Sequence, residues 1–453
     1  MRGGRGGWYL SAAALAVVVA GLAAVGLDVG RTPSAPTSRP TPPSTPALRP
    51  VLRPLSATAP VPTAAGLRGA LATVLRDPAL GSQLAVSVVD AATGAPLFES
   101  RAAAGVVPAS TAKIITALAA LTVLPHDRRL TTRVLAGPAP GDVVLVGAGD
   151  PTLAGAYAVG GYPKAARLVD LADAVRRARG GVAVTRVLVD DTLFTGPRLG
   201  PGWKPTYVTG GDVAPVSALG VDGGRASRGD HVPRVEDPAL DAGRQLARLL
   251  GGRPGVERGR AAVGAAQLGA VAGPTVAQLV ELALTRSDND LAEALGRQIA
   301  LAAGQPASFD GETTAIRTVL ARLQVPLDDV RLLDASGLSP QDRIAPAALS
   351  RLLAKASSDP RYGALLSGLP VAGFDGTLAE RYHRGPAAQA AGAIRAKTGT
   401  LDGVSALAGL LRTREGRLLA FDLAAVGAPF AATRQLQSAL DQVAAVVVSC
   451  GCR

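Results

Sequence analysis

Cysteine, methionine and aromatic residues are scarce in this chain of 453 residues. The two cysteines, Cys450 and Cys452, lie two positions apart at the C-terminal end, which is too few for a disulfide framework or a zinc site. We therefore expect no metal site, and a short tail at 450–453 in which a local disulfide could form. The net charge of +12 comes from scattered arginine, without the basic run or aromatic stripe typical of nucleic-acid binding, so we expect no nucleic-acid partner.

Histidine is equally rare, and its positions argue against one large class of hydrolase. The three histidines are His126, His231 and His383, and none has the apolar surroundings typical of a triad base. A serine hydrolase with a Ser-His-Asp triad needs a histidine held beside its serine. Surface positions are the simpler interpretation of all three, so any serine chemistry here needs another base.

Lysine is scarce as well, and two of the few lysines stand in short motifs. Of 47 basic residues, five are lysine: Lys113, Lys164, Lys204, Lys355 and Lys397. Lys113 ends the string Ser110-Thr-Ala-Lys113, and Lys397 begins the string Lys397-Thr-Gly-Thr400. A third string, Ser287-Asp-Asn289, lies between them in the sequence. An arginine does not give up its proton in a protein, whereas a buried lysine near a second cation can become neutral and act as a base. Any one of these strings could be an ordinary surface segment, but that interpretation does not account for all three strings in this order.

The segments around the motifs predict helices and strands that would bring them together. Pro108 to Leu124 is strongly apolar and predicts a helix, which places Ser110 and Lys113 one turn apart on the same face. Near the C-terminus, three apolar segments separated by turns predict neighbouring strands, and a closing helix follows. The predicted strands are Leu84–Asp90, Pro96–Glu99, Ile394–Thr400, Val404–Leu411 and Leu418–Val426, and the closing helix is Thr433–Val448.

A long stretch between the first two motifs predicts an inserted domain. Lys113 and Ser287 are separated by 173 residues, far more than one connection needs. Within this stretch, strand patterns at 142–146 and 185–190 alternate with helical patterns at 164–179 and 238–250. We expect an α+β insert at 130–272, which leaves 64–129 and 273–449 as a discontinuous catalytic domain.

The order of the three strings resembles the signature of penicillin-binding proteins and serine β-lactamases. With the large insert, the chain is similar to the D-alanyl-D-alanine carboxypeptidases and endopeptidases of the class C low-molecular-mass penicillin-binding proteins, over roughly 64–448. Five further strings fit: Gly149–Leu153, Phe194–Arg198 with Gly202-Trp203, Pro215–Leu219, Asp334–Leu338, and Gly373–Leu378 with Arg381. The resemblance implies an α+β fold, with a β-lactamase/transpeptidase-like antiparallel sheet flanked by helices and a large inserted α+β domain.

The same resemblance implies the catalytic roles of three residues. Ser110 would attack the carbonyl of the penultimate D-alanine, with neutral Lys113 as the base. Ser287 would relay the proton to the leaving amine, and water would then release the acyl-enzyme. This chemistry needs no cofactor.

The resemblance also implies how the substrate is held. Asn289 would position the substrate backbone amide. Lys397, with Thr398 and Thr400, would bind the terminal carboxylate, and its charge would keep the first lysine deprotonated by repulsion. The oxyanion would lie between the backbone N–H groups of Ser110 and Thr400. The implied partners are peptidoglycan stem peptides ending in D-Ala-D-Ala, and β-lactam antibiotics as covalent inhibitors.

Two alternative functions stay open at this point. A β-lactamase or esterase of the same fold would share the motifs, but a class A β-lactamase needs a glutamate to activate water, and 313–379 contains none. A non-catalytic wall-binding protein would be expected to have lost at least one motif residue, and all are present. We therefore predict a serine-type carboxypeptidase that penicillin inhibits, with cleavage of cross-links as a second reaction on the same D-alanyl bond.

The N-terminus predicts export. Arg2 and Arg5 precede an uncharged run of 20 residues at 8–27, long enough to span a bilayer with its start toward the cytoplasm. The segment at 1–31 is thus either a membrane anchor or a cleaved signal peptide. The ten prolines of 32–63 predict an extended linker. Both alternatives place the enzyme outside the cytoplasm, either anchored to the cell membrane or secreted to the wall.

The residue that would bind the amine of the substrate's diamino acid is not fixed by the sequence. Family members tend to have acidic and aromatic residues after the Gly-Trp pair, whereas 204–212 reads Lys-Pro-Thr-Tyr-Val-Thr-Gly-Gly-Asp. Asp212 is one candidate, and Asp190 and Asp191 are alternatives. Leu401 would supply an apolar wall.

Overall fold

The computed structural model describes residues 58–158, 161–229, 231–251, 253–325, 329–427 and 430–451. The predicted anchor or signal peptide at 1–31 lies outside these ranges, as does most of the predicted linker at 32–63. Within them, no helix combines the length and apolar character needed to cross a bilayer. Cys450 is buried and disulfide-bonded, and Cys452 lies outside the described residues.

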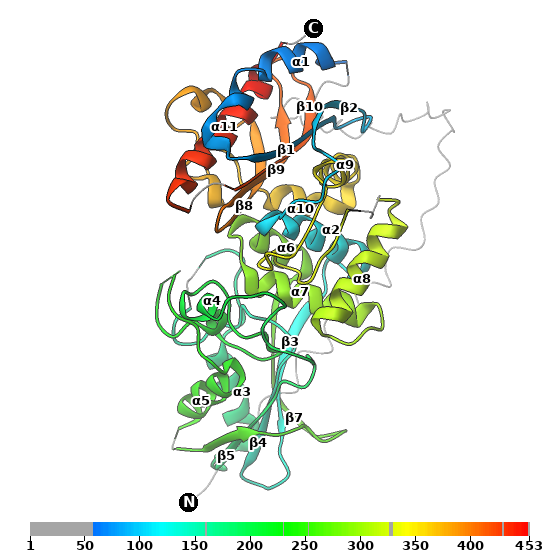
Figure 1. The fold of residues 1–453 in the computed structure, drawn as a ribbon. Coiled ribbons are helices and arrows are strands. Elements are labelled where there is room, and N and C mark those ends of the chain that lie inside the picture. The colour runs from blue at the N-terminus through cyan, green and yellow to red at the C-terminus, as the bar shows by residue number, and fades with distance from the viewer. Residues whose placement is uncertain are drawn as a thin grey trace, which may run out of the picture. The chain divides into compact units, whose positions relative to one another are not determined.

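The first of two sheets joins strands from both ends of the described chain (Figure 1), as the sequence predicted. Its five strands pair in the order β2-β1-β10-β9-β8, and every pair is antiparallel. Strand β8 carries the third motif at the edge of this sheet. The strands are β1 (Gln83–Asp90), β2 (Pro96–Ser100), β8 (Ile394–Leu401), β9 (Val404–Arg412) and β10 (Leu418–Val426).

Helices cover both faces of this sheet because its side chains are apolar on both sides. Along β10, Phe421 and Leu423 pack in one cluster with Leu440 of α11 (Thr433–Ser449). Ala420, the residue before Phe421, belongs to the cluster on the other face. The alternation follows the two-residue period of a strand. That second cluster also contains α9 (Pro346–Ser357), which packs against β1, β9 and β10.

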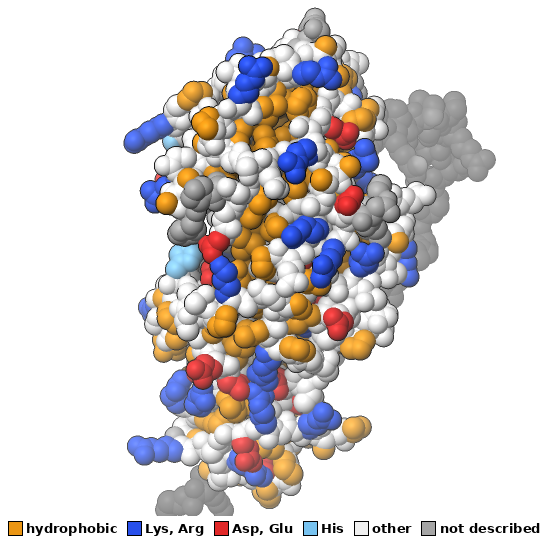
Figure 2. All heavy atoms as spheres, viewed as in Figure 1, with side chains coloured by type: hydrophobic (Ala, Val, Ile, Leu, Met, Phe, Trp, Pro, Cys, Tyr) orange, Lys and Arg blue, Asp and Glu red, His pale blue; other side chains and the backbone are white. Residues whose placement is uncertain are grey.

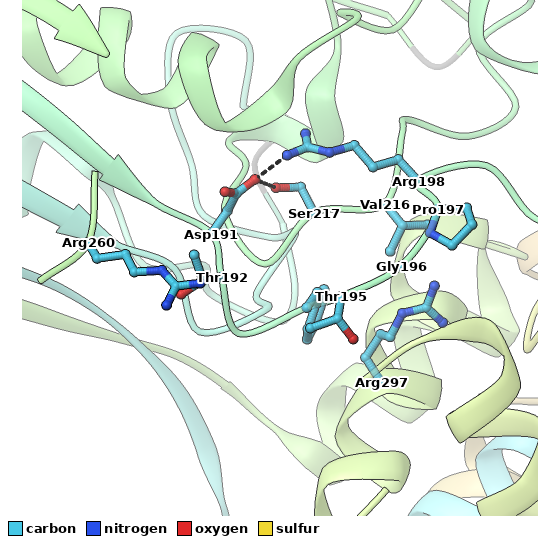
Figure 3. A pocket seen from close by; sticks show the side chains of 11 residues that line it. Asp191, Thr192, Thr195, Gly196, Pro197, Arg198, Val216, Ser217, Arg260 and Arg297 are labelled. Carbon is cyan, nitrogen blue, oxygen red and sulfur yellow. Dashed lines mark hydrogen bonds and ion pairs between the residues drawn. The ribbon is translucent and has the colours of Figure 1, made fainter. Parts of the chain in front are cut away.

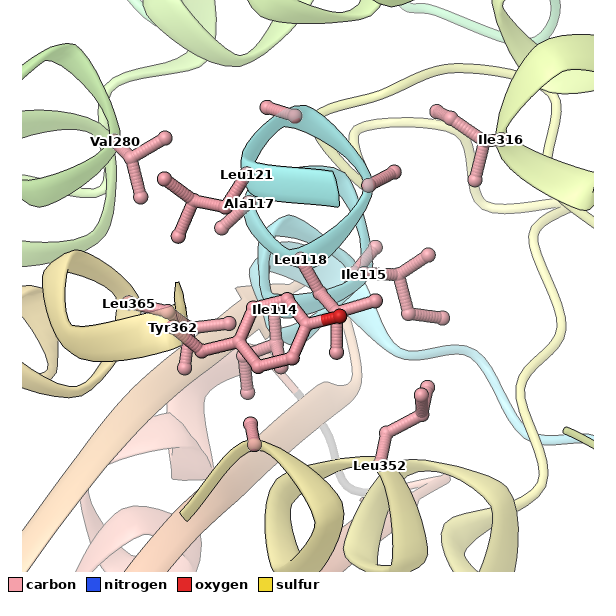
Figure 4. Close-up of a cluster of buried hydrophobic side chains, with 14 of the residues drawn as sticks. Ile114, Ile115, Ala117, Leu118, Leu121, Val280, Ile316, Leu352, Tyr362 and Leu365 are labelled. Atoms are coloured by element: carbon pink, nitrogen blue, oxygen red, sulfur yellow. The ribbon is translucent and has the colours of Figure 1, made fainter. Parts of the chain in front are cut away.

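Helix α2 (Lys113–Val123) passes through the centre of the helical layer. Figure 4 shows Leu118 and Ile114 beside Tyr362, with Val280 and Ile316 on neighbouring helices. Side chains are buried on every face of α2, so the helix has no polar stripe. Its first residue, Lys113, is therefore held on a fixed, fully packed support.

The second sheet is built from the segment between the first two motifs. Its strands pair in the order β6-β5-β4-β3-β7, with β4, β5 and β6 parallel and β3 antiparallel to both its neighbours. Helices α3 (Leu168–Arg179) and α5 (Pro238–Leu250) supply the crossovers between the parallel strands and share a core with them. The strands are β3 (Arg129–Ala136), β4 (Asp142–Val146), β5 (Arg186–Asp190), β6 (Gly255–Arg258) and β7 (Gln267–Thr275).

This second sheet begins directly after α2 and ends directly before α6 (Val276–Thr285). The capping box of Thr275 and Gln278 starts that helix at the last residue of β7. The predicted limits of the insert, 130 and 272, lie within the first and last strands, and its status as a separate domain stays a proposal.

The remaining elements are short or surround the motifs. The helices are α1 (Ala64–Leu71), α4 (Thr206–Thr209), α7 (Asn289–Ala302), α8 (Phe309–Arg322) and α10 (Gly363–Gly368). Single 3₁₀ turns occur at η1 (Val74–Arg76), η2 (Pro78–Leu80), η3 (Ala109–Ala112), η4 (Asp222–Gly224), η5 (Pro360–Tyr362), η6 (Gly376–Leu378), η7 (Pro386–Ala390) and η8 (Phe430–Ala432). Lys and Arg side chains are scattered over the face in Figure 2, without one basic patch.

Candidate active site

Ser110 lies in the 3₁₀ turn η3, which leads directly into α2. The preceding residue, Ala109, has a φ of 47° in the left-handed region, so the turn is strained and sharply bent. Two glycines make room for it. A Cβ on Gly337 would lie 1.9 Å from the Ala109 carbonyl oxygen, and one on Gly399 would lie 2.6 Å from the Pro108 oxygen. The loop after 334 and strand β8 can therefore both approach the serine closely.

The amine of Lys113 joins all parts of the site. It donates to Ser110 Oγ at 2.9 Å, to Asn289 Oδ1 at 2.6 Å and to the Ser336 carbonyl at 2.7 Å. These acceptors come from the turn before α2, the first residue of α7 and the loop after 334. The amine is thus fixed beside the serine hydroxyl, with Lys113 almost entirely buried.

Burial is the main cause of the lowered pKa of Lys113, which is about 8. Removing an ammonium group from water favours the neutral form. Carboxylates at Asp334 and Glu293 oppose this shift, followed by those at 288 and 290. Our prediction from the family resemblance, that repulsion from Lys397 keeps Lys113 deprotonated, stays a prediction. The two lysines do act on one another, since the charge of Lys113 lowers the pKa of Lys397.

Ser287 lies at the junction between α6 and α7, in the left-handed region with a φ of 57°. Its hydroxyl accepts a hydrogen bond from Lys397 Nζ at 2.8 Å. The carboxylate of Asp288 caps the next helix by accepting from Leu291 N at 2.9 Å. Helix α7 therefore begins at Asn289, whose side chain reaches the first lysine.

Lys397 lies in β8 and is fully buried. Besides its bond to Ser287, it donates to the Thr398 carbonyl at 2.8 Å. Burial holds the pKa of Lys397 well below its usual range, and the charge of Lys113 lowers it further. The two lysines are thus close enough to influence one another, each bound to a different serine.

A cavity of about 1040 Å³ connects the reactive groups to solvent. Ser110, Ser287, Asn289 and Thr400 line it. Thr398 does not line it, because its hydroxyl donates to Thr377 Oγ1 at 2.7 Å. Thr377 does face the cavity. Its string, Gly373–Leu378, stood out in the sequence, but we did not assign that threonine a role.

The structure separates the three acidic candidates for reading the substrate side chain. Asp212 lines the cavity, and its backbone carbonyl accepts from Asn289 Nδ2 at 2.8 Å. Asp190 instead accepts from Thr192 and Ala261, away from this cavity. Asp191 is paired with arginines in a different cavity, described below. Leu401 lines the Ser110 cavity.

A buried polar network supports the loop that holds Lys113, and the sequence did not reveal it. Glu293 Oε1 accepts from Ser336 N at 2.9 Å, on the same residue whose carbonyl accepts from the lysine. Asp334 accepts from Trp203 Nε1 at 2.7 Å and from Gly337 N at 2.6 Å. The Asp334–Leu338 and Gly202-Trp203 strings were noticed separately, and no sequence pattern indicated that they meet.

Comparisons with known proteins show the family to which the chain belongs. The family model described as the D-Ala-D-Ala carboxypeptidase 3 (S13) family matches residues 67–232 and 228–447. "Carboxypeptidase DacB" of Mycolicibacterium smegmatis is 40% identical over 455 residues, covering 97% of this chain and 96% of that protein. The "D-alanyl-D-alanine carboxypeptidase" of Actinomadura sp. strain R39 is 30% identical, covering 78% of this chain and 79% of that protein.

A solved structure shares the fold. The crystal structure of penicillin binding protein 4 from Haemophilus influenzae superposes with a TM-score of 0.67 at 19% identity, covering 83% of this chain and 98% of that one. This likeness confirms the predicted fold class, in which an antiparallel sheet flanked by helices is combined with further α+β structure.

Proposed function

The chain belongs to the D-Ala-D-Ala carboxypeptidase 3 (S13) family and is a serine-type carboxypeptidase, and we propose that Ser110 is its nucleophile. The observation that carries this proposal is the 2.9 Å contact between Lys113 Nζ and Ser110 Oγ at the wall of the large cavity. A nucleophile within hydrogen-bond reach of a deprotonable amine is the arrangement that acyl transfer requires.

We propose the following acylation step. In the neutral form of Lys113, the amine accepts the proton of Ser110 as Oγ attacks the carbonyl carbon of the penultimate D-alanine. The bond to the leaving amine then breaks, and Ser287 relays a proton to that nitrogen. The hydroxyl of Ser287 is held for this task by Lys397 at 2.8 Å. Water later attacks the ester and restores the free serine.

We further propose how the substrate lies in the cavity. The backbone N–H groups of Ser110 and Thr400 would bind the oxyanion, and both residues line the cavity. Lys397 and Thr400 would bind the terminal carboxylate, and Thr398 would join them once its hydroxyl leaves Thr377, a further hydroxyl in the same wall. Asn289 would hold the substrate amide. Its Oδ1 now accepts from Lys113 and its Nδ2 donates to the Asp212 carbonyl, so substrate binding would have to replace one of these two bonds.

The substrate class follows from this arrangement and from the family. A cavity of about 1040 Å³ is larger than a D-Ala-D-Ala terminus needs, so we propose that it takes the stem peptide of peptidoglycan. Trimming of a peptide end and cleavage of a cross-link break the same D-alanyl bond, so one site serves both reactions. β-Lactam antibiotics would acylate the same serine. We place the enzyme outside the cytoplasm, at the membrane or in the wall.

Intact-mass spectrometry tests the nucleophile. The full chain incubated with penicillin should gain the mass of one penicilloyl group and keep it for minutes, because 313–379 offers no glutamate to activate the deacylating water. Ser110→Ala should gain none, while Ser87→Ala, a buried serine in β1, should label normally if it folds. Labelling of Ser110→Ala would refute the assignment, and rapid loss of the label would favour a β-lactamase.

A further inference from the structure

A second cavity, of about 230 Å³, is lined by a different set of residues from the Ser110 cavity. It lies where loops after β5 and β6 meet helix α7, and Figure 3 shows its lining. Two strings that fitted the family, Phe194–Arg198 and Pro215–Leu219, contribute most of its wall, and the proposed reaction uses neither. These strings therefore have no role yet assigned.

Three arginines from three separate segments line this cavity: Arg198, Arg260 and Arg297. Its single acidic lining residue, Asp191, is already fully engaged. Asp191 accepts from Arg198 Nη2 at 2.5 Å, from Ser217 Oγ at 3.2 Å and from Arg258 Nη1 at 2.9 Å. A carboxylate with this many donors has little remaining capacity for a cation, so the cavity has the character of an anion site.

Arg297 is a buried arginine at the inner wall of the cavity, and one edge of its guanidinium makes no hydrogen bond within the described residues. The side chain is fully buried, and its Nη1 pairs with Glu312. Within the described residues, Nε and Nη2 have no hydrogen-bond partner. These two nitrogens form the side-on fork that binds two oxygens of a carboxylate or phosphate. Both nitrogens are buried and the guanidinium packs over the Phe309 ring at 4.1 Å from its centroid, so the fork lies behind the cavity wall and makes no direct contact with a ligand.

Arg260 contributes charge from the open side. It is exposed, and across the described ranges it makes no hydrogen bond or ion pair, although its charge acts on Asp190. Figure 3 shows Thr195 between Arg260 and Arg297. The hydroxyl of Thr195 also makes no hydrogen bond within the described part of the chain, and the residue is exposed. A ligand entering here would meet an available guanidinium and an available hydroxyl.

We propose that this cavity binds a phosphate group, either free or as a phosphomonoester. The guanidinium of Arg198 is held by Asp191, so the positive charge for a phosphate dianion comes from Arg260 and Arg297, which lie on two separate segments. Arg260 and Thr195 would make the direct contacts, and Arg297 would add its charge at the inner wall. The cavity holds several times the volume of one water molecule, which leaves room for an organic substituent on the phosphate.

Isothermal titration of the full chain tests the site. The probes are inorganic phosphate and glycerol 3-phosphate, with chloride at matched ionic strength as the reference. We expect saturable binding of phosphate with a Kd on the order of 1 mM or tighter. Arg260→Gln should weaken binding by about 10-fold, the usual loss for one charge-assisted hydrogen bond. Arg253→Gln, an exposed arginine outside the cavity, is the matched control and should bind as the parent does.

Each outcome separates the alternatives. Tighter binding of glycerol 3-phosphate than of inorganic phosphate would identify an ester as the occupant, and the reverse would identify the free ion. Penicillin labelling should be unchanged in both variants, because neither residue touches the Ser110 cavity. Absence of saturable phosphate binding would overturn the proposal, as would equal affinities in Arg260→Gln and Arg253→Gln.

Discussion

The start of α2 and the middle of β8 each hold a buried lysine, but the two regions treat the charge differently. Lys113 donates to three oxygens, and four nearby carboxylates raise its pKa against the effect of burial. Lys397 donates to two oxygens, and both causes of its shifted pKa, burial and the first lysine, lower it. The two lysines are therefore equally buried, but their surroundings act on their pKa values in different ways: carboxylates oppose the lowering at Lys113, and none of the causes opposes it at Lys397.

The difference shows that the motif alone does not set the chemistry of its lysine. Three of the carboxylates near Lys113 come from the start of α7, at 288, 290 and 293, and the fourth is Asp334. They return its pKa to about 8, where an amine can both take and release a proton near neutral pH. We infer that the first region is suited to proton transfer, whereas the second binds an anionic group by regaining its proton when the negative charge of that group raises the pKa of Lys397.

Replacing Lys113 is the strongest test of the difference between the two lysines. Lys113→Arg keeps the positive charge but cannot accept a proton, so acylation by penicillin should fall by about 10³-fold or more. The rate is measured by stopped-flow or by intact mass against time, with circular dichroism as the check on folding. Acylation within 10-fold of the parent rate would show that Lys113 is not the base.

The pH dependence gives the next largest effect. Because the pKa of Lys113 is lowered to about 8, the neutral base is abundant above that pH and is lost below it. The acylation rate should therefore level off above about pH 8 and fall roughly 10-fold for each unit below it. Penicillin is the reporter, since the carboxylate it carries does not titrate in this range. A flat profile from pH 6 to 9 would contradict the assignment.

Replacing the second lysine should have a smaller effect. Lys397→Arg keeps the charge that a substrate carboxylate needs, so acylation should fall by roughly 10- to 100-fold, less than in Lys113→Arg. The permanent charge should also move the rise in the pH profile to lower pH, because it disfavours protonation of Lys113. If the order of the two variants were reversed, the two regions would have exchanged roles.

The sequence predicted the catalytic sheet well because its strands have strong, local signals. All five predicted strands of that sheet were found within two residues of their predicted ends, and the closing helix was predicted to within one residue. The helical pattern at 164–179 was less accurate, since α3 begins at Leu168. The predicted helix started directly after Pro163, and its first four residues read Lys-Ala-Ala-Arg, where a periodic pattern carries little information.

The site was predictable only in its motifs. Ser110, Lys113 and Asn289 were chosen from short strings, and the structure places them within hydrogen-bond reach of one another through the lysine. The partners that tune the lysine were not visible. Glu293 and Asp334 lie 41 positions apart in the chain, and each looks like an ordinary charged residue in the sequence. Their contacts depend on tertiary packing, which no local pattern records.

The smallest effect distinguishes two hydroxyls on β8 itself. Thr400 lines the cavity, whereas Thr398 is almost buried and donates to Thr377. Thr400→Val should raise KM for a D-Ala-D-Ala peptide by about 10-fold, and Thr398→Val by about 2- to 3-fold, because a neutral hydrogen bond contributes about 0.5–1.5 kcal/mol and only the first is available to the substrate. Steady-state kinetics with both valine variants measures the ratio. A larger effect at Thr398 would mean that substrate binding breaks its bond to Thr377 and turns that hydroxyl into the cavity, so that the carboxylate is read by both threonines of this strand.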